Sequence, residues 1–196
     1  MKIESSHNYS PFSISGVYII TPEIHEDERG FFFESWNIER FNSIIKEDVS
    51  FYQDNHSFSF KGVLRGLHYQ VKPFDQGKLV RCIKGEIFDV AVDIRMHSPS
   101  FGKWCGVYLN EKNKKQFWIP TGFAHGFFTT SDTAEVIYKS TQRWSKEHEK
   151  SIVWNDNKLN INWPLKENLI KMPIVNEKDL KAKTLLQASK EGELFK

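Results

Sequence analysis

Short segments of alternating apolar and polar residues run along most of this chain and constrain its fold more than any other feature. They are rich in β-branched and aromatic residues, which favour strands, and Gly, Pro, Asn, Asp or Ser separates most of them. The segments read GVYII, GFFFESW, SFYQDN, KLVRCIKGEIFDVAVDI, KWCGVYL, QFWIP, AHGFFTT and AEVIYKS. Sixteen phenylalanines suit the space between facing sheets. The sequence therefore predicts an all-β fold, a β-sandwich or jelly roll.

Two segments depart from this pattern and predict helices. Between residues 37 and 48 four apolar side chains recur at helical spacing, namely Ile38, Phe41, Ile44 and Ile45. After residue 164 the chain becomes charged and amphipathic, and we expect helix from about Glu177. There is no internal repeat or low-complexity linker, and 196 residues suit one all-β domain. We expect a single domain over 1–196, with a core of about 16–164 and a C-terminal helical segment of about 165–196.

Charge and cysteine content argue against several classes of protein. A net charge of +2 is too balanced for a surface that binds nucleic acid or membrane by charge alone. No apolar run approaches the ~20 residues that span a bilayer, and the first ten residues, MKIESSHNYS, lack the apolar stretch of a signal peptide. Cys82 and Cys105 lie in strand-like segments, and we expect reduced core thiols rather than a disulfide. We therefore expect a cytoplasmic protein.

The run GVLRGLHYQ, residues 62–70, places an arginine and a histidine in one predicted strand. Strict alternation would point Arg65 to one face of the sheet and His68 to the other. Metal-binding cupins take ligands from two histidines one residue apart, a glutamate and a later histidine. Here Gln70 follows His68 at the second position, and His125 in PTGFAHGF matches the later histidine. Lys78 nearby would repel a divalent cation, so we expect no metal.

Histidine, arginine, lysine and tyrosine in one cavity suit proton transfer beside an anionic ligand. An imidazole accepts a proton near neutral pH, an ammonium stabilises an oxyanion, a phenol returns a proton, and a guanidinium binds phosphate oxygens. These residue types alone do not decide the function, because a single buried histidine is more often structural than catalytic.

The order and spelling of seven motifs carry more information. They are DERGFFFESW, QDNHSFS, GVLRGLHYQ, QGKLVRCIKGEIFDVAVDIR, SPSFGKW, FWIPTGFAHGF and YKSTQRW. Together they closely resemble the dTDP-4-dehydrorhamnose 3,5-epimerase family, of the cupin superfamily. The resemblance covers residues from about 16 to 164, plus a C-terminal EKD, in the family's order.

The resemblance implies a cupin jelly roll with a few peripheral helices, a homodimer, and no metal or other cofactor. It implies inversion of C3 and C5 of dTDP-4-dehydro-6-deoxy-D-glucose to give dTDP-4-dehydro-L-rhamnose, a precursor of cell-surface polysaccharide such as lipopolysaccharide. The 4-ketone acidifies both neighbouring C–H bonds, so the reaction needs a base, an oxyanion stabiliser and an acid. By resemblance these roles fall to His68 as base, Asp179 as its orienter, Lys78 beside the enolate oxygen and Tyr138 as acid.

Substrate-binding residues carry over from the same motifs. They are Arg29 and Glu34, which contact nucleotide across the dimer; Gln53 and Asn55, which line the cavity; Arg65 at the diphosphate; His125 by the sugar; Trp144, where the family commonly stacks a tyrosine on thymine; and the more peripheral Glu149 and Lys178. Plainer readings stay open: a turn residue for Arg29, solvent-facing strand residues for Glu34 and Gln53, a core aromatic for Trp144, and solvated charges for Glu149 and Lys178. Asp89 either bonds a cavity histidine or has a structural role, and we leave it out of the site.

Two alternative functions stay open on the sequence. One is a related epimerase that inverts a single centre or uses another nucleotide sugar, and the other is a cupin that binds a sugar nucleotide without turnover. His68, Lys78 and Tyr138 together argue against the second, because a binding protein has no need of a base and an acid. Placement of the sugar ring separates the first from the 3,5-epimerase, and the sequence does not reveal it.

Overall fold

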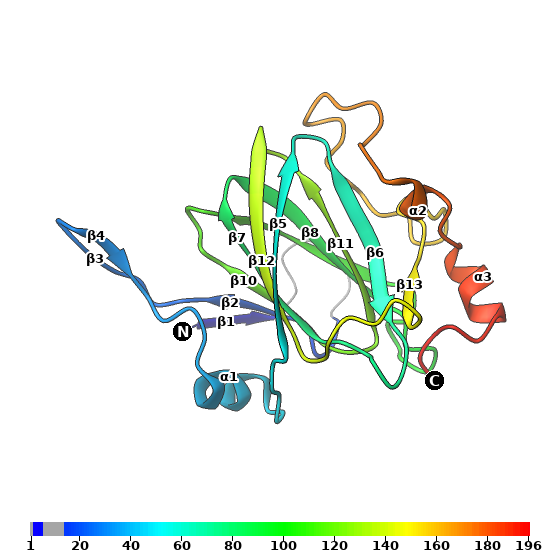
Figure 1. The fold of residues 1–196 in the computed structure, drawn as a ribbon, viewed down its shortest axis with the longest axis horizontal. Helices are drawn as coiled ribbons and strands as arrows, with labels where there is room; N and C mark the ends of the chain where they lie inside the picture. The colour runs from blue at the N-terminus through cyan, green and yellow to red at the C-terminus, as the bar shows by residue number, and fades with distance from the viewer. Residues whose placement is uncertain (1, 6–13) are drawn as a thin grey trace.

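The computed structural model describes residues 2–5 and 14–196, and two antiparallel sheets packed face to face form its body (Figure 1). The first sheet has the order β1 (Lys2–Ser5), β2 (Tyr18–Thr21), β10 (Gln116–Ile119), β7 (Lys78–Lys84), β12 (Thr133–Ser140), β5 (Gln53–Phe60). The second has the order β13 (Glu149–Ser151), β6 (Leu64–Gln70), β11 (Phe123–Thr129), β8 (Glu86–Asp93), β9 (Trp104–Asn110). The predicted all-β fold of facing sheets is confirmed.

The apolar core lies between the sheets. At one end of the strands, polar side chains replace the apolar ones between the sheets. Along β7 the inward side chains are Lys78, Val80 and Cys82, of which the last two belong to the core cluster. On β12, Val136 lies in the same cluster, and Tyr138 lies against it at the polar end. A cavity can form there because the large apolar side chains stop before the ends of the strands.

Both cysteines lie in this core as separate thiols, as predicted. Burial raises the pKa of the Cys82 thiol to about 12, so this cysteine stays protonated and unreactive near neutral pH. None of the helices among residues 2–5 and 14–196 is long and apolar enough to cross a membrane.

One helix packs at an end of the first sheet, and two short helices lie beside the second. Helix α1 (Ile38–Ile45) begins at Asn37, whose side chain accepts the Arg40 amide hydrogen, and packs Phe41 onto Trp118 of the first sheet. It is shorter than the predicted 37–48 because the next residue, Lys46, takes a left-handed conformation. The predicted C-terminal helix is instead two short helices, α2 (Glu177–Leu180) and α3 (Leu185–Lys190), beside the second sheet (Figure 1).

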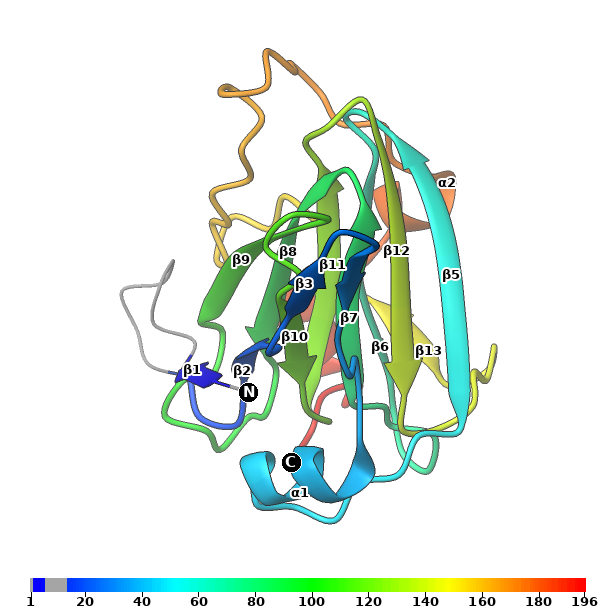
Figure 2. The same ribbon diagram turned by 90° about the vertical axis from the view of Figure 1, so that its left-hand side faces the viewer.

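A small hairpin projects away from the two sheets. Its strands β3 (His25–Asp27) and β4 (Gly30–Phe32) pair only with each other, and all six residues are exposed. The hairpin extends beyond the first sheet in Figure 1, and Figure 2 views the molecule from that side. Two phenylalanines on its second strand, Phe31 and Phe32, are more than half exposed, which is unusual for an isolated chain in water.

Candidate active site

A polar cavity of about 90 Å³ lies between the sheets at the end where the core becomes polar. It is lined by Gln53, Asn55, His68, Tyr69, Gln70, Gln76, Lys78, Tyr138, Trp144 and Glu149. Seven of these are candidate site residues from the sequence, and they come from strands of both sheets and from the loop after β12. We call this space the active-site cavity.

A bulge in β6 corrects the expectation that Arg65 and His68 face opposite ways. His68 pairs with His125 of β11, and Arg65 pairs with Phe127, so three steps on β6 match two on its partner. The extra residue breaks the alternation. Leu64, Leu67 and Tyr69 accordingly share the outer apolar cluster of the second sheet.

With those three side chains outside, Arg65 and His68 both turn toward the facing sheet. The Arg65 guanidinium donates to the Ser59 hydroxyl at 3.0 Å and to the Phe58 carbonyl at 2.9 Å, both on β5. Its charge also lowers the pKa of Tyr138, although burial raises that pKa more. Arg65 and His68 thus lie on one face of β6 because of the bulge.

The bulge depends on Gly66. Its φ of +127° is unfavourable for other residues, and a Cβ there would lie 2.5 Å from the Gly126 Cα. The Gly66 amide hydrogen is donated to Oδ2 of Asp179 at 3.1 Å. Asp179 is completely buried, so one carboxylate holds the bulge from outside the strand.

The other oxygen of Asp179 binds the imidazole. His68 Nε2 lies 2.7 Å from Asp179 Oδ1. The N-cap residue of α2, Asn176, holds Asp179 in place because its side chain accepts the Asp179 amide hydrogen. Burial alone would raise the pKa of Asp179, but the hydrogen bonds from His68 and Gly66 and the charge of Lys178 hold it below its usual value. An ionised carboxylate can only accept, so Nε2 carries the proton and Nδ1 is left free to take one.

Lys78 stands in the same cavity with almost no exposure to solvent. Its ammonium lies 3.4 Å from the His68 carbonyl oxygen. Burial lowers the pKa of Lys78 to about 8, while the charges of Asp89 and Glu149 oppose that effect. The ammonium therefore persists at neutral pH but is poorly solvated, which strengthens its attraction for an anion.

Tyr138 lines the cavity from the facing sheet. It lies on β12 opposite Asn55 of β5, whereas His68 lies on β6. Burial raises the pKa of Tyr138, and the charge of Glu149 raises it further. The phenol therefore keeps its proton near neutral pH and is a potential donor on the side opposite the imidazole.

Trp144 and Gln53 form the rim of the cavity. The Gln53 amide donates to Asn55 Oδ1 at 2.7 Å and accepts the backbone N–H of Trp144 at 2.8 Å. Trp144 is 52% exposed, so it is a rim residue and not a core aromatic. Glu149 lines the cavity and forms an ion pair with Lys178 of α2, so these two charges are not simply solvated.

Six of the thirteen candidate residues lie outside the lining of the cavity. Asp179 binds His68, Lys178 pairs with Glu149, and Arg65 is held by β5. The other three are Arg29, Glu34 and His125. Arg29 is exposed on the hairpin and pairs with Asp27, and Glu34 pairs with Arg40 near α1. His125 is buried directly beside His68 in the sheet. The structure thus places His125 next to His68 but does not bring Arg29 or Glu34 to the cavity of their own chain.

The candidate site residues from the sequence do not include Gln70, Gln76 or Asp89. Gln70 donates to the carbonyls of Phe74 and Arg143, so it ties together the two loops at the mouth. Its position two residues after His68 was a usable signal, because both then share a face. Asp89 lies 2.6 Å from His125 Nε2, so the structure shows the first of the two readings left open for it, a bond to a cavity histidine.

One known protein family accounts for most of this chain. A sequence model of the family described as dTDP-4-dehydrorhamnose 3,5-epimerase matches residues 11–187. This chain belongs to that family. A 3,5-epimerase of Shigella flexneri is 52% identical over 175 residues, which are 89% of this chain and 94% of the relative. One from Methanothermobacter thermautotrophicus is 48% identical, over 88% of this chain and 91% of the relative.

Solved structures of the 3,5-epimerase family share the whole fold. The RmlC enzyme of Legionella pneumophila, in complex with dTDP-4-keto-L-rhamnose, has a TM-score of 0.88 and 47% identity, over 96% of this chain and 97% of that one. The RmlC epimerase of Mycobacterium tuberculosis has a TM-score of 0.92 and 34% identity, over 100% and 94%. These likenesses confirm the family and the cupin jelly roll expected from the seven motifs.

Proposed function

We propose that this protein is a dTDP-4-dehydrorhamnose 3,5-epimerase that converts dTDP-4-dehydro-6-deoxy-D-glucose to dTDP-4-dehydro-L-rhamnose. The observation that carries the proposal is the pair of proton carriers on facing sheets, with the Asp179-bound His68 on one side of the cavity and the protonated Tyr138 on the other. Inversion at carbon needs a base and an acid on opposite faces of the ring. Membership of the family indicates that the substrate is a sugar nucleotide.

The mechanism follows from these groups. The C–H bond next to the 4-ketone breaks, its proton goes to Nδ1 of His68, and the electron pair moves to the ketone oxygen as an enolate. The Lys78 ammonium stabilises that oxygen, and Tyr138 donates its proton to the opposite face of the same carbon. His68 then gives up its proton and Tyr138 regains one through solvent. The same sequence at the second carbon completes the product.

The rim and floor of the cavity suit the rest of the substrate. The exposed indole of Trp144 offers a large flat face for the thymine ring. Arg65, held by β5, would pair with the diphosphate, and Glu149 with Lys178 would contact the ligand at the edge of the cavity. Gln53, Asn55 and His125 would surround the sugar.

Product identity tests this proposal. After incubation with dTDP-4-dehydro-6-deoxy-D-glucose, borohydride reduces the 4-ketone and acid releases the sugars for chromatography. We expect rhamnose and its C4 epimer, which form only when both C3 and C5 have inverted. Recovery of 6-deoxyglucose and its C4 epimer alone would contradict the proposal.

Inversion at one centre is the second candidate, and one comparison favours it. ChmJ, a 3'-monoepimerase of Streptomyces bikiniensis solved with dTDP-quinovose, has a TM-score of 0.86 and 32% identity, over 94% of this chain and 91% of that one. The same fold therefore serves a single inversion. Identity near 50% to the 3,5-epimerases favours the double inversion, and sugars inverted at only C3 or C5 in the borohydride assay would identify the alternative.

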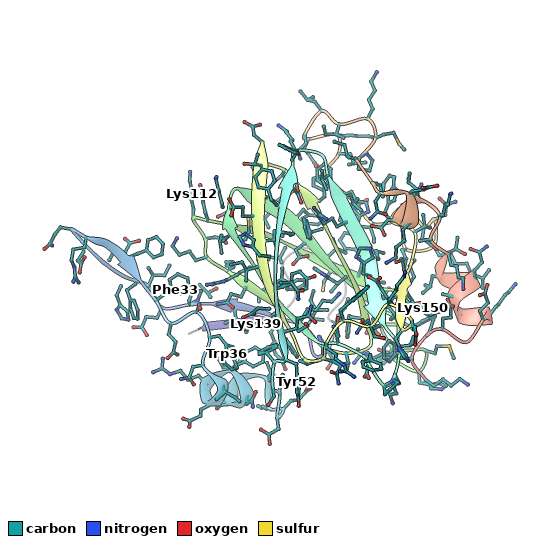
Figure 3. The ribbon with its side chains drawn as sticks, in the orientation of Figure 1. Phe33, Trp36, Tyr52, Lys112, Lys139 and Lys150 are labelled. Carbon is teal, nitrogen blue, oxygen red and sulfur yellow. The ribbon has the colours of Figure 1, made fainter. Side chains whose placement is uncertain are left out.

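We further propose a homodimer in which Arg29 and Glu34 serve the partner's cavity. The projecting hairpin, with its exposed phenylalanines, supports this assembly. So does a hollow of about 330 Å³ on the outer face of the first sheet, lined in part by Trp36 and Lys139 (Figure 3). An isolated chain would leave this hollow and the exposed phenylalanines open to water.

The assembly gives a prediction for Arg29. Sedimentation should show a dimer, and Arg29→Ala should raise KM by roughly 10–100-fold, the usual worth of a hydrogen bond to a charged group. Lys190→Ala, which removes an exposed cation on α3, beside the second sheet, should leave KM unchanged. A fully active monomer, or an Arg29→Ala variant with the KM of the unaltered protein, would contradict the cross-subunit role.

The donor set of the cavity predicts resistance to chelators. Gln70 stands where a second histidine would be needed, and the Lys78 ammonium would repel a divalent ion. We therefore expect full epimerase activity after dialysis against EDTA. Activity lost in EDTA and restored by a single divalent ion would show that a metal takes part.

A further inference from the structure

A second carboxylate lies behind the active-site cavity. Asp89 is completely buried on the inward face of β8, between Ile87 and Ala91 of the core cluster. Its Oδ1 lies 2.6 Å from His125 Nε2, while its Oδ2 is buried with no hydrogen-bond partner among residues 2–5 and 14–196. A buried carboxylate oxygen without a partner is costly, and such a group calls for an explanation.

The partner of Asp89 does not neutralise it. Burial lowers the pKa of His125, and the charges of Lys78 and His68 also lower it, although Asp89 acts in the opposite direction. The imidazole therefore stays neutral near neutral pH and donates only a hydrogen bond. The negative charge of Asp89 remains available to its other neighbours.

The charge of Asp89 acts on Lys78, which lines the cavity from β7 of the facing sheet. Five elements bring titratable groups to this part of the cavity: Asp89 on β8, His125 on β11, His68 on β6, Glu149 on β13 and Tyr138 on β12. Two of them are anions. Glu149 already forms an ion pair with Lys178, whereas Asp89 has only a neutral partner.

We propose that Asp89 is a positioning residue for the epimerisation, which fixes His125 with Nδ1 free and supplies the counter-charge that keeps Lys78 an ammonium. This inference rests on the proposed function in one respect, the role of Lys78 beside the enolate oxygen. Asp89 lies outside the lining of the cavity and acts only through the two side chains in front of it.

Asp89→Asn removes the charge and keeps the shape, because an amide oxygen still accepts the His125 hydrogen bond. Burial lowers the pKa of Lys78 to about 8 and the Asp89 charge opposes this, so the alkaline limb of the kcat/KM profile should move to lower pH by about one unit. At pH 8 this is roughly a fivefold loss, and at pH 6.5 less than about 1.5-fold. An unchanged alkaline limb would overturn the proposal.

Asp93→Asn is the matched control. Asp93 is an equally buried carboxylate at the C-terminal end of β8; it is bound by Arg95, Ser98 and Ser100 and does not line the cavity. Its replacement should leave the position of the alkaline limb unchanged, whatever it does to thermal stability. A limb that moves equally in both variants would contradict a specific role for Asp89.

NMR tests the same proposal without turnover. In the protein with unaltered sequence, His125 should be neutral with its proton on Nε2, and labelled Lys78, assigned through Lys78→Arg, should titrate at lower pH in Asp89→Asn. A proton on Nδ1 of His125 in the unaltered protein would overturn the proposal, and this result does not depend on whether the variant folds. A Lys78 titration that is identical in the unaltered protein and in Asp89→Asn would overturn it too. A shifted titration in a protein without epimerase activity would support Asp89 and refute the proposed function.

Discussion

His68→Asn should abolish both proton exchange and epimerisation while the protein still folds and binds dTDP. The asparagine amide is smaller than the imidazole but can still donate to Asp179, which is completely buried and needs a hydrogen-bond partner. It removes Nδ1, the only group assigned to accept the substrate proton. A positioned general base contributes about 10²–10⁴-fold, so kcat should fall by at least that range.

Proton NMR in heavy water would measure exchange, and calorimetry would measure dTDP binding. His97→Asn is the control, since His97 is an exposed histidine on the loop after β8. Its variant should exchange and epimerise at the rate of the unaltered protein. If His68→Asn exchanges at that rate too, the base is another group.

Tyr138→Phe should separate the two halves of the reaction. The change removes one hydroxyl and leaves the ring against the core cluster. The enolate should still form at His68 and be stabilised by Lys78, and His68 can return a proton to the face it came from. Deuterium should therefore enter the substrate with retained configuration, while inverted product falls by about 10²–10⁴-fold.

One NMR experiment follows both quantities for Tyr138→Phe. Tyr108→Phe is a matched control, because that tyrosine packs against Phe88 on the opposite side of the second sheet from the cavity. Loss of exchange together with inversion would show that Tyr138 positions the substrate or assists the first step. Loss of neither would mean that the acid is another residue or a water molecule.

Most of the fold could be predicted from local pattern because strand alternation and helix spacing are local properties. Most of the alternating segments became strands, although GFFFESW is strand only over Gly30–Phe32 and SFYQDN only from Gln53, and the segment with Phe41 and Ile45 became α1. The faces of β6 could not be predicted, since the bulge arises from the contact of Gly66 with Gly126 on a neighbouring strand. The C-terminal end of α1 could not be predicted either, because nothing in the sequence around Lys46 indicates a left-handed backbone conformation.

The candidate site divides in the same way. His68 and Lys78 can be recognised from the sequence as polar residues in apolar strands. The role of Asp179 was predicted only from the resemblance to the family. Residue pattern alone could not pair His68 with a carboxylate 111 positions away. Asp89 needed the strand register as well, because nothing in its own segment distinguishes a counter-charge from a structural carboxylate.

Heavy-water exchange in the unaltered protein tests the central claim most directly. The account predicts that incubation with dTDP-4-dehydro-6-deoxy-D-glucose places deuterium at both C3 and C5, and that the deuterated product has the L-rhamno configuration. Proton NMR would record the loss of both ring signals and the new coupling constants together. Deuterium at one carbon alone would contradict double inversion, and inverted product without any deuterium would contradict an enolate formed by His68 and reprotonated by Tyr138.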